Sequence, residues 1–207
     1  MRGRAGVFAG GGGAGAMSDG VAATVAGEAV TVGDVDARER TIRVGGAEHA
    51  LPRPGTSEGR QLRRWLTQVL VAERVVAQEA AVRHLDTASA PAEADVLPDT
   101  VARLEIGSVA AATLSAPAGR AVFTDVTADV RVSDDEVAGY HLRNPDRFVR
   151  GADLDQVRPV VAAHLLAAAR RREYRRWLDA RCAELVVLAP GYEHPGDPRQ
   201  PDNTHRH

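Results

Sequence analysis

The stretch VAATVAGEAVTV, residues 21–32, is rich in β-branched side chains and is interrupted by Gly27. This pattern predicts two short strands joined by a tight turn. Two strands alone leave an open edge of backbone N–H and C=O groups, which needs a partner. A second apolar run, LVVL at residues 185–188, ends at Pro190 and is typical of a short buried strand. We therefore expect the two ends of the chain to pair in one small sheet.

Between these ends the apolar pattern changes to helical spacing. Side chains recurring at three- and four-residue steps predict helices over residues 59–85, 99–114 and 153–183. A cap signature predicts a shorter helix over residues 32–40. Over residues 122–132 one set of side chains, mostly valine, alternates with a more polar set at every second position, and this period of two predicts a strand instead of a helix. The expected fold class is mainly α with a small β-sheet.

The clearest local signal is the segment SDDE at residues 133–136. The Ser133 side chain can cap the amide of Glu136, while the Glu136 carboxylate reaches back to the Ser133 amide. This capping box predicts a helix that begins at residue 134. The helix should end near Arg143, because Pro145 disfavours helical geometry at the residue before it.

Composition is that of an ordinary globular protein, with 44% hydrophobic and 26% charged residues. All 26 basic residues are arginine, which excludes Schiff-base and Walker-type lysine chemistry. The net charge of -2 provides no global positive field for nucleic acid or membranes. The single cysteine, Cys182, excludes an intrachain disulfide and a multi-cysteine metal site.

Both ends of the chain are expected to lie outside a folded domain at residues 21–190. Residues 1–20 combine a glycine run with a second start signal at Met17, and we expect them to be disordered or untranslated. Residues 191–207 hold three prolines among polar residues and predict an irregular tail. No stretch approaches the ~20 apolar residues of a membrane span. We expect a cytoplasmic protein, or an exported one if residues 1–16 act as a weak signal.

Four segments, in this order, resemble the chaperone domain of SurA-type, parvulin-linked peptidyl-prolyl isomerases, which is related in fold to the chaperone region of trigger factor. The segments are VAGEAVTVGDVDARE (25–39), RQLRRWLTQVLVAERVVAQEAA (60–81), VSDDEVAGYHLRNPDRF (132–148) and RREYRRWLDARCAELVV (171–187). In that family a parvulin domain follows the segment that here ends at Phe148. In this chain the next capped helix follows within a few residues, so the isomerase module is missing near residues 149–152.

The resemblance implies binding of unfolded or extended polypeptide without chemistry, so we expect neither enzymatic activity nor a cofactor. Binding would use an apolar cradle between the helix at residues 59–85 and the C-terminal helix. Burial of client side chains there contributes ~25 cal/mol per Å², which is weak per contact and therefore promiscuous. The candidate lining residues are Trp65, Val69, Val76, Tyr140, Leu165 and Trp177.

The C-terminal helix also carries a cluster of arginines with Tyr174 and Trp177 interleaved. The cluster consists of Arg170, Arg171, Arg172, Arg175, Arg176 and Arg181. It can be a solvated helix face, a surface that binds nucleic acid, or a docking surface for one dedicated protein partner. Glu173 and Asp179 partly neutralise it and favour the solvated face. The candidate docking residues are Arg171, Arg172, Arg175 and Arg176.

Motifs for catalysis are missing from the sequence. It contains no G-x-S-x-G elbow for a serine nucleophile. Cys182 and His164 lie eighteen residues apart on one predicted helix, a separation of roughly 27 Å along a straight helix, so we interpret Cys182 as a core residue. A metal-dependent activity would have to use His194, His205 and His207 near the C-terminus, where an ordinary polar tail is the simpler interpretation. We expect no bound metal.

Overall fold

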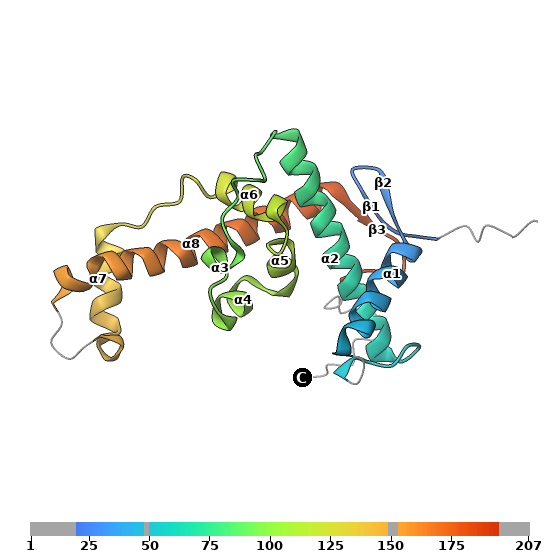
Figure 1. Cartoon of the computed structure of the whole chain (residues 1–207), viewed down its shortest axis with the longest axis horizontal. Coiled ribbons are helices and arrows are strands. Elements are labelled where there is room, and N and C mark those ends of the chain that lie inside the picture. Colours follow the sequence, from blue (N-terminus) through green and yellow to red (C-terminus); the bar gives the residue numbers. More distant parts are fainter. Residues whose placement is uncertain (1–19, 48–49, 149–152, 195–207) are drawn as a thin grey trace, which may run out of the picture.

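The computed structural model describes residues 20–47, 50–148 and 153–194 of the 207-residue chain. Within these residues the fold is mainly helical and has one three-stranded antiparallel sheet, which confirms the predicted fold class. Figure 1 shows an elongated molecule in which the C-terminal helix runs along much of the length, with shorter helices around its middle and the sheet near one end.

The sheet joins the two ends of the described chain. Its strands are β1 (Val21–Val25), β2 (Glu28–Thr31) and β3 (Val186–Leu188), in the order β2-β1-β3. In the antiparallel register of β1 and β3, Thr24 lies opposite Val187. The predicted pairing of the N-terminal strands with a C-terminal strand is therefore confirmed, and every other element lies between the paired ends.

Helices α1 (Val32–Ile42) and α2 (Ser57–Val82) follow the strands close to their predicted positions. Thr31 begins α1 in a capping box, and Thr56 caps α2 by accepting a hydrogen bond from a backbone amide. A short π-helical turn, η1 (Arg43–Ala47), extends α1. The apolar stripe of α2 is buried, because this helix packs against the sheet and against α1, α5, α6 and α8.

The middle of the chain differs from the sequence prediction in two respects. It forms four short helices, α3 (Glu93–Val96), α4 (Thr100–Ile106), α5 (Ser108–Thr113) and α6 (Pro117–Val126). The single helix predicted over residues 99–114 is wrong, because Gly107 has a φ of +87° and breaks it into α4 and α5. The left-handed conformation favours glycine, which has no Cβ.

The strand predicted over residues 122–132 is also wrong. Residues up to Val126 belong to α6, and a turn at residues 127–129 and a short irregular segment follow before the next helix. Pro117 starts α6, where its missing N–H costs nothing because the first helical amides have no partner within the helix. Val122 and Val126 are four residues apart and face inward on α6. A spacing of four residues fits one face of a helix as well as one face of a strand, so these valines did not distinguish the two.

The capping box of Ser133 and Glu136 is confirmed. The Glu136 amide donates to Ser133 Oγ at 3.3 Å, and the Ser133 amide donates to the Glu136 carboxylate at 2.8 Å. It begins α7 (Asp134–Arg143), which is followed by the short 3₁₀ helix η3 (Pro145–Arg147) and by α8 (Leu154–Leu185).

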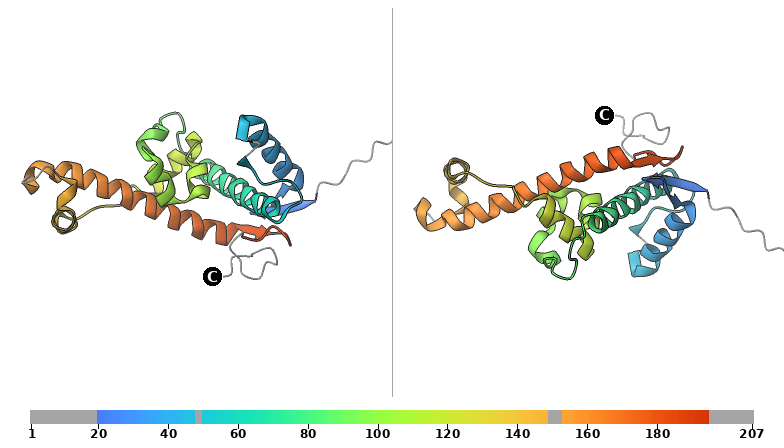
Figure 2. Two further views of the ribbon diagram at one scale, coloured as in Figure 1. Left: turned by 90° about the horizontal axis from the view of Figure 1, so that it is seen from below. Right: turned by 90° about the horizontal axis from the view of Figure 1, so that it is seen from above.

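Helix α7 packs across the N-terminal part of α8, and both extend away from the sheet in the two views of Figure 2. We call α7, η3 and residues 154–165 of α8 the arm. Residues 149–152, where the sequence analysis expects the isomerase module to be missing, lie outside the described residues. Most of the two predicted terminal segments, residues 1–19 and 195–207, also lie outside them. Residues 191–194 are irregular, as predicted.

The core lies where α2, α4, α5 and α6 meet α8 and the sheet. Tyr174 of α8 is fully buried at its centre, and its hydroxyl is 2.7 Å from Thr113 Oγ. A smaller cluster around Ala22, Val35 and Leu66 holds α1 to α2. In the part of the chain that the structure describes, no helix is both long and apolar enough to cross a membrane.

Candidate functional site

An apolar pocket of about 360 Å³ lies between α2, the junction of α4 with α5, and α8. We call it the Trp65 pocket. Its apolar lining consists of Trp65, Ile106, Val109, Ala110 and Leu178, together with the backbone at Gly107. Its polar lining consists of Gln68, Ser108, Arg175, Asp179, Cys182 and His194.

Local structure explains how these residues meet. The turn at Gly107 places Ile106, the last residue of α4, and Ser108, the first of α5, on the pocket wall. Trp65 Nε1 donates a hydrogen bond to Ser108 Oγ at 2.9 Å, which ties the indole of α2 to α5. The bond occupies the polar edge of the indole, and the apolar ring surface of Trp65 lines the pocket.

The charged groups of the pocket lie at its solvent-exposed side. Arg175 and Asp179, one turn apart on α8, form an ion pair of 3.8 Å with side-chain exposures of 54% and 72%. A pair so exposed is weak, because water screens it. Burial, and then the charge of Asp179, raise the pKa of the Cys182 thiol to about 11. The thiol is therefore protonated at neutral pH and is not a nucleophile.

The structure divides the six predicted cradle residues among several places. Trp65 lines the Trp65 pocket, as just described. Val69 and Val76 are each 2% exposed, so they present no surface to a ligand. The apolar stripe of α2 suggested all three, but most of this stripe faces the core.

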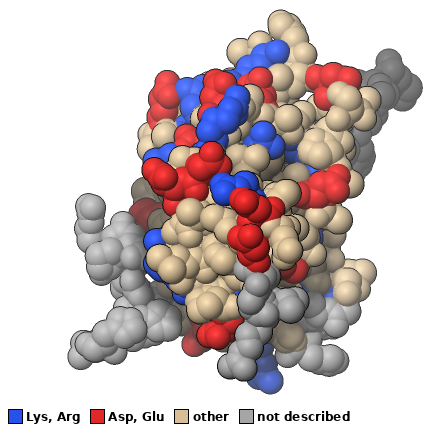
Figure 3. Space-filling view, turned by 90° about the vertical axis from the view of Figure 1, so that its left-hand side faces the viewer, with Lys and Arg blue, Asp and Glu red and all other residues tan. Residues whose placement is uncertain are grey.

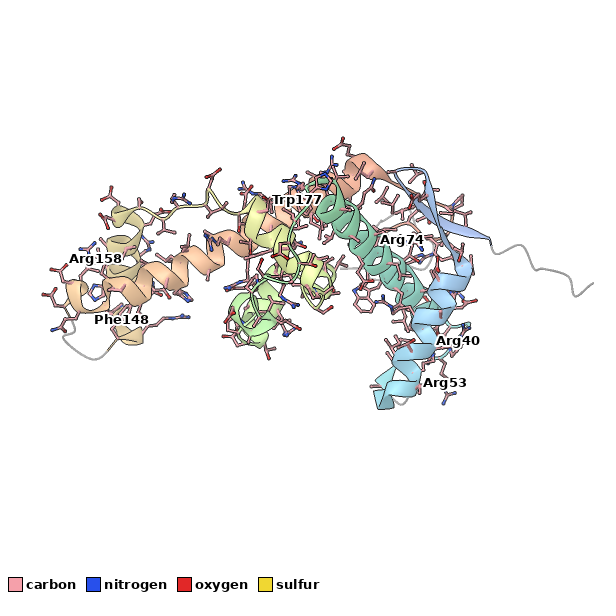
Figure 4. The ribbon with its side chains drawn as sticks, turned by 45° about the horizontal axis from the view of Figure 1, so that its top comes forward. Arg40, Arg53, Arg74, Phe148, Arg158 and Trp177 are labelled. Carbon is pink, nitrogen blue, oxygen red and sulfur yellow. The ribbon has the colours of Figure 1, made fainter. Side chains whose placement is uncertain are left out.

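Tyr140 and Leu165 belong to the arm, and both are half-buried. The Tyr140 ring lies 5.5 Å from that of His164 and 6.5 Å from that of Phe148. Figure 4 shows Phe148 near one end of the molecule and Trp177 near its middle, where α8 meets α2. The predicted cradle is therefore not one continuous surface.

Trp177 lies where α8 crosses α2 and is not among the residues that line the Trp65 pocket. Its ring stacks on Tyr174 at 5.7 Å between centroids, and the Arg83 guanidinium lies 6.0 Å from its centroid. These contacts hold Trp177 in the packing between the two helices. The two tryptophans therefore do not both line the Trp65 pocket.

A second hollow of about 180 Å³ lies between α3, α6 and α8. Its residues are Asp95, Val96, Phe123, Ala163, Leu166, Ala167 and Arg170. It borders the arm, where Leu142 and Val160 are 80% and 72% exposed. Apolar surface is thus available outside the Trp65 pocket as well.

The arginines of α8 pair with acidic residues on several different elements. Arg171 is buried and donates to Glu105 of α4 at 3.0 Å, whereas Arg181 donates to Glu79 of α2. Arg176 pairs with its helical neighbour Glu173. Arg172 is exposed and contributes to lowering the pKa of Glu136 on α7, after the hydrogen bonds from Ser133. Figure 3 likewise shows basic and acidic side chains interspersed on the face at the end of the arm.

Residues 20–47, 50–148 and 153–194 contain no group of three or more His, Cys, Asp or Glu side chains placed to hold a metal. His194 lines the Trp65 pocket, while His205 and His207 lie outside the described residues. The sequence prediction missed Gln68, Ile106 and Ser108 as pocket residues. The glycine at position 107, between two apolar runs, was the available signal for the turn that brings Ile106 and Ser108 there.

Fold and pocket together define a small, mainly helical domain with the apolar pocket described above and a three-stranded sheet built from both ends of the described chain. Residues 21–58 match a family of unknown function, DUF7158. The match covers β1, β2, α1 and only the first two residues of α2, and it stops before the residues that line the Trp65 pocket. No curated protein and no solved structure gives a significant match to the chain.

Proposed function

We propose that this protein binds unfolded or extended polypeptide without catalysing a reaction, in the manner of a chaperone. The observation that carries the proposal is the Trp65 pocket. Its volume of about 360 Å³ accommodates a large apolar side chain together with some of its backbone. Its lining is largely apolar and includes a few polar groups, of which the charged pair Arg175 and Asp179 is mostly in solvent, a composition typical of ligand pockets in proteins.

Exposed apolar side chains elsewhere support binding of a long, variable ligand. Leu104 on α4 is 76% exposed, and Leu142 and Val160 on the arm are exposed to a similar degree. Each such contact adds little free energy, so several separated contacts favour an extended chain over a compact ligand. The order of the elements and the sheet built from both chain ends agree with the resemblance to SurA-type chaperone domains, which adds support.

The proposal is tested by measuring how the protein suppresses aggregation of a chemically unfolded client. We expect suppression at stoichiometric excess, and about tenfold weaker client binding for Trp65→Ala, because a central aromatic contact is lost. Val82→Ala is the matched control: it removes an exposed apolar side chain, 68% exposed, at the end of the same helix and away from the pocket.

Thermal unfolding of both variants shows whether they remain folded. If Trp65→Ala unfolds, Val109→Asp places a charge in the same pocket from α5 and serves as the second variant. A folded protein that leaves the client aggregating at stoichiometric excess contradicts the proposed function. Equal client binding by the native protein and both pocket variants contradicts the role of the pocket.

A further inference from the structure

Two residues that line the Trp65 pocket carry hydrogen-bond donors that are unsatisfied or only weakly paired in the described structure. Gln68 lines the pocket, and its Nε2 is buried without a hydrogen-bond partner in the described part of the chain. A buried donor without an acceptor is unfavourable, so native structures rarely keep one that has no role. An acceptor bound in this pocket would satisfy the Gln68 amide.

The second donor is Arg175, which reaches the pocket from α8 on the side of Gly107. A Cβ built at Gly107 would lie 3.7 Å from Arg175 Nη1, so the guanidinium lies against the bare backbone of the α4–α5 turn. The ion pair with Asp179 is long and involves Nε, and the carboxylate is largely in solvent. The two Nη atoms therefore remain available for a planar acceptor such as a carboxylate.

We propose that the Trp65 pocket recognises the carboxy-terminal residue of an extended polypeptide, which rests on the proposed polypeptide binding and specifies its ligand. The terminal apolar side chain packs on Trp65 and Leu178, and the terminal carboxylate accepts hydrogen bonds from Arg175 and Gln68. An internal residue offers only a neutral carbonyl at this position. A hydrogen bond from a guanidinium to a carboxylate is roughly twice as strong as a neutral one, so chain ends are preferred.

The test compares two fluorescent ten-residue peptides that both end in leucine, one with a free carboxylate and one with a carboxamide. Titration by fluorescence anisotropy should show about tenfold tighter binding of the free acid, the difference expected for one charge-assisted hydrogen bond. Arg175→Gln should reduce this preference to about twofold or less while leaving the carboxamide affinity unchanged.

Arg176→Gln is the matched control, because Arg176 is an exposed arginine on the next position of α8 that pairs with Glu173 and does not line the pocket. It should keep the full preference. Gln68→Met removes the second donor with little change in volume and should lower the preference as well. This second variant keeps the proposal testable if Arg175→Gln does not fold.

Equal affinities of the native protein for the two peptides would overturn the inference and leave polypeptide binding intact. A preference that persists in both Arg175→Gln and Gln68→Met would also overturn it. Decanoate tests the alternative source of an apolar carboxylate, and binding of decanoate as tight as that of the free-acid peptide would contradict recognition of a polypeptide end. If the folded protein binds neither peptide, this inference and the proposed function both fail.

Discussion

Among single residues, Glu79 is a buried carboxylate that links two helices through ion pairs. Its carboxylate, 8% exposed, accepts hydrogen bonds from Arg181 Nε at 3.0 Å and from Arg83 Nε at 3.1 Å. Burial by itself would raise the pKa of Glu79, but the hydrogen bonds and charges of the two arginines outweigh it, so the pKa lies below its ordinary value. Glu79 thus connects α2 to α8 on the side of Trp177.

Replacing this carboxylate should destabilise the fold. We expect Glu79→Gln to lower the free energy of unfolding by about 2 kcal/mol at pH 7, because Arg83 and Arg181 lose their shared buried partner and keep only the more exposed carboxylates of Asp125 and Glu184. A carboxyl whose folded-state pKa is depressed stabilises the protein above its unfolded pKa and stops doing so as the pH falls through the folded value. The difference from the native protein should therefore shrink below pH 4.5, the ordinary value for this group.

Urea unfolding at pH 7 and at pH 4 measures both effects. Glu184→Gln is the control, because Glu184 also pairs with Arg181 but its side chain is 64% exposed. Its effect should stay within about 0.5 kcal/mol. If the two variants lost the same stability, the buried position of Glu79 would be irrelevant to its contribution.

Cys182 provides a second prediction for a single residue. Because burial, followed by the Asp179 charge, raises the pKa of its thiol from 9.0 to about 11, alkylation by iodoacetamide at pH 8 should be about a hundredfold slower than for an exposed cysteine. The rate should rise about tenfold per pH unit up to pH 10. The urea-unfolded protein is the control and should react at the ordinary rate, and a native protein that reacts equally fast would contradict the buried thiol.

At the scale of secondary-structure elements, the packing of α6 on α5 requires a glycine. A Cβ at Gly119 would lie 1.9 Å from the Thr113 carbonyl oxygen, a distance that no contact tolerates. The backbones of α5 and α6 can therefore approach this closely only because position 119 has no side chain. This contact places α6, with Val122 and Phe123, against the core.

Gly119→Ala should therefore destabilise the protein by at least about 2 kcal/mol, since backbone must move to admit one methyl group. Gly139→Ala on α7 is the matched helical control, because its nearest neighbour is the flexible end of Arg143 at 3.0 Å. Alanine is the better helix former there, so this variant should be neutral or up to about 1 kcal/mol more stable. Differential scanning calorimetry compares the two, and equal melting temperatures would refute the close contact at Gly119.

At the scale of the whole molecule, the sheet makes the two ends of the described chain depend on each other. Strand β3 has three residues, and in the described structure it is held by β1 on one side. The Ala26 amide donates to the Leu185 carbonyl at 2.8 Å, which extends the pairing beyond the strands. All residues that line the Trp65 pocket except His194 lie in the sequence between β1 and β3.

Breaking the closure should affect global stability. Val187→Pro removes a backbone N–H from β3, and we expect it to lower the free energy of unfolding by roughly 2 kcal/mol in a single cooperative transition. Val187→Thr is the control, because the side chain is 69% exposed and threonine keeps both the N–H and the β-branched shape. A Val187→Pro protein that unfolds like the control would show that β3 contributes nothing to the fold.

Local signals in the sequence predicted much of this architecture. These signals depend on residues that are near each other in the chain, so they can be predicted without a structure. They include the capping box at Ser133, the caps of α1 and α2, and the long helix α8. The alternation over residues 122–132 misled because valines spaced by four fit a helix as well as a strand. Tertiary packing on α2 and α8 decides between the two.

The sequence by itself therefore determined the mainly helical class, the strands at both ends, and the absence of lysine side chains and of an intrachain disulfide within these 207 residues. Only the tertiary structure decided which side of α2 is accessible, and that Trp65, Gln68, Gly107 and Arg175 meet around one pocket. The physical reason is that a cap or a periodic stripe is a short-range property, with its partners within one or two turns. This pocket lies where α2, α4, α5 and α8 meet, and their arrangement depends on the packing of all their side chains at once.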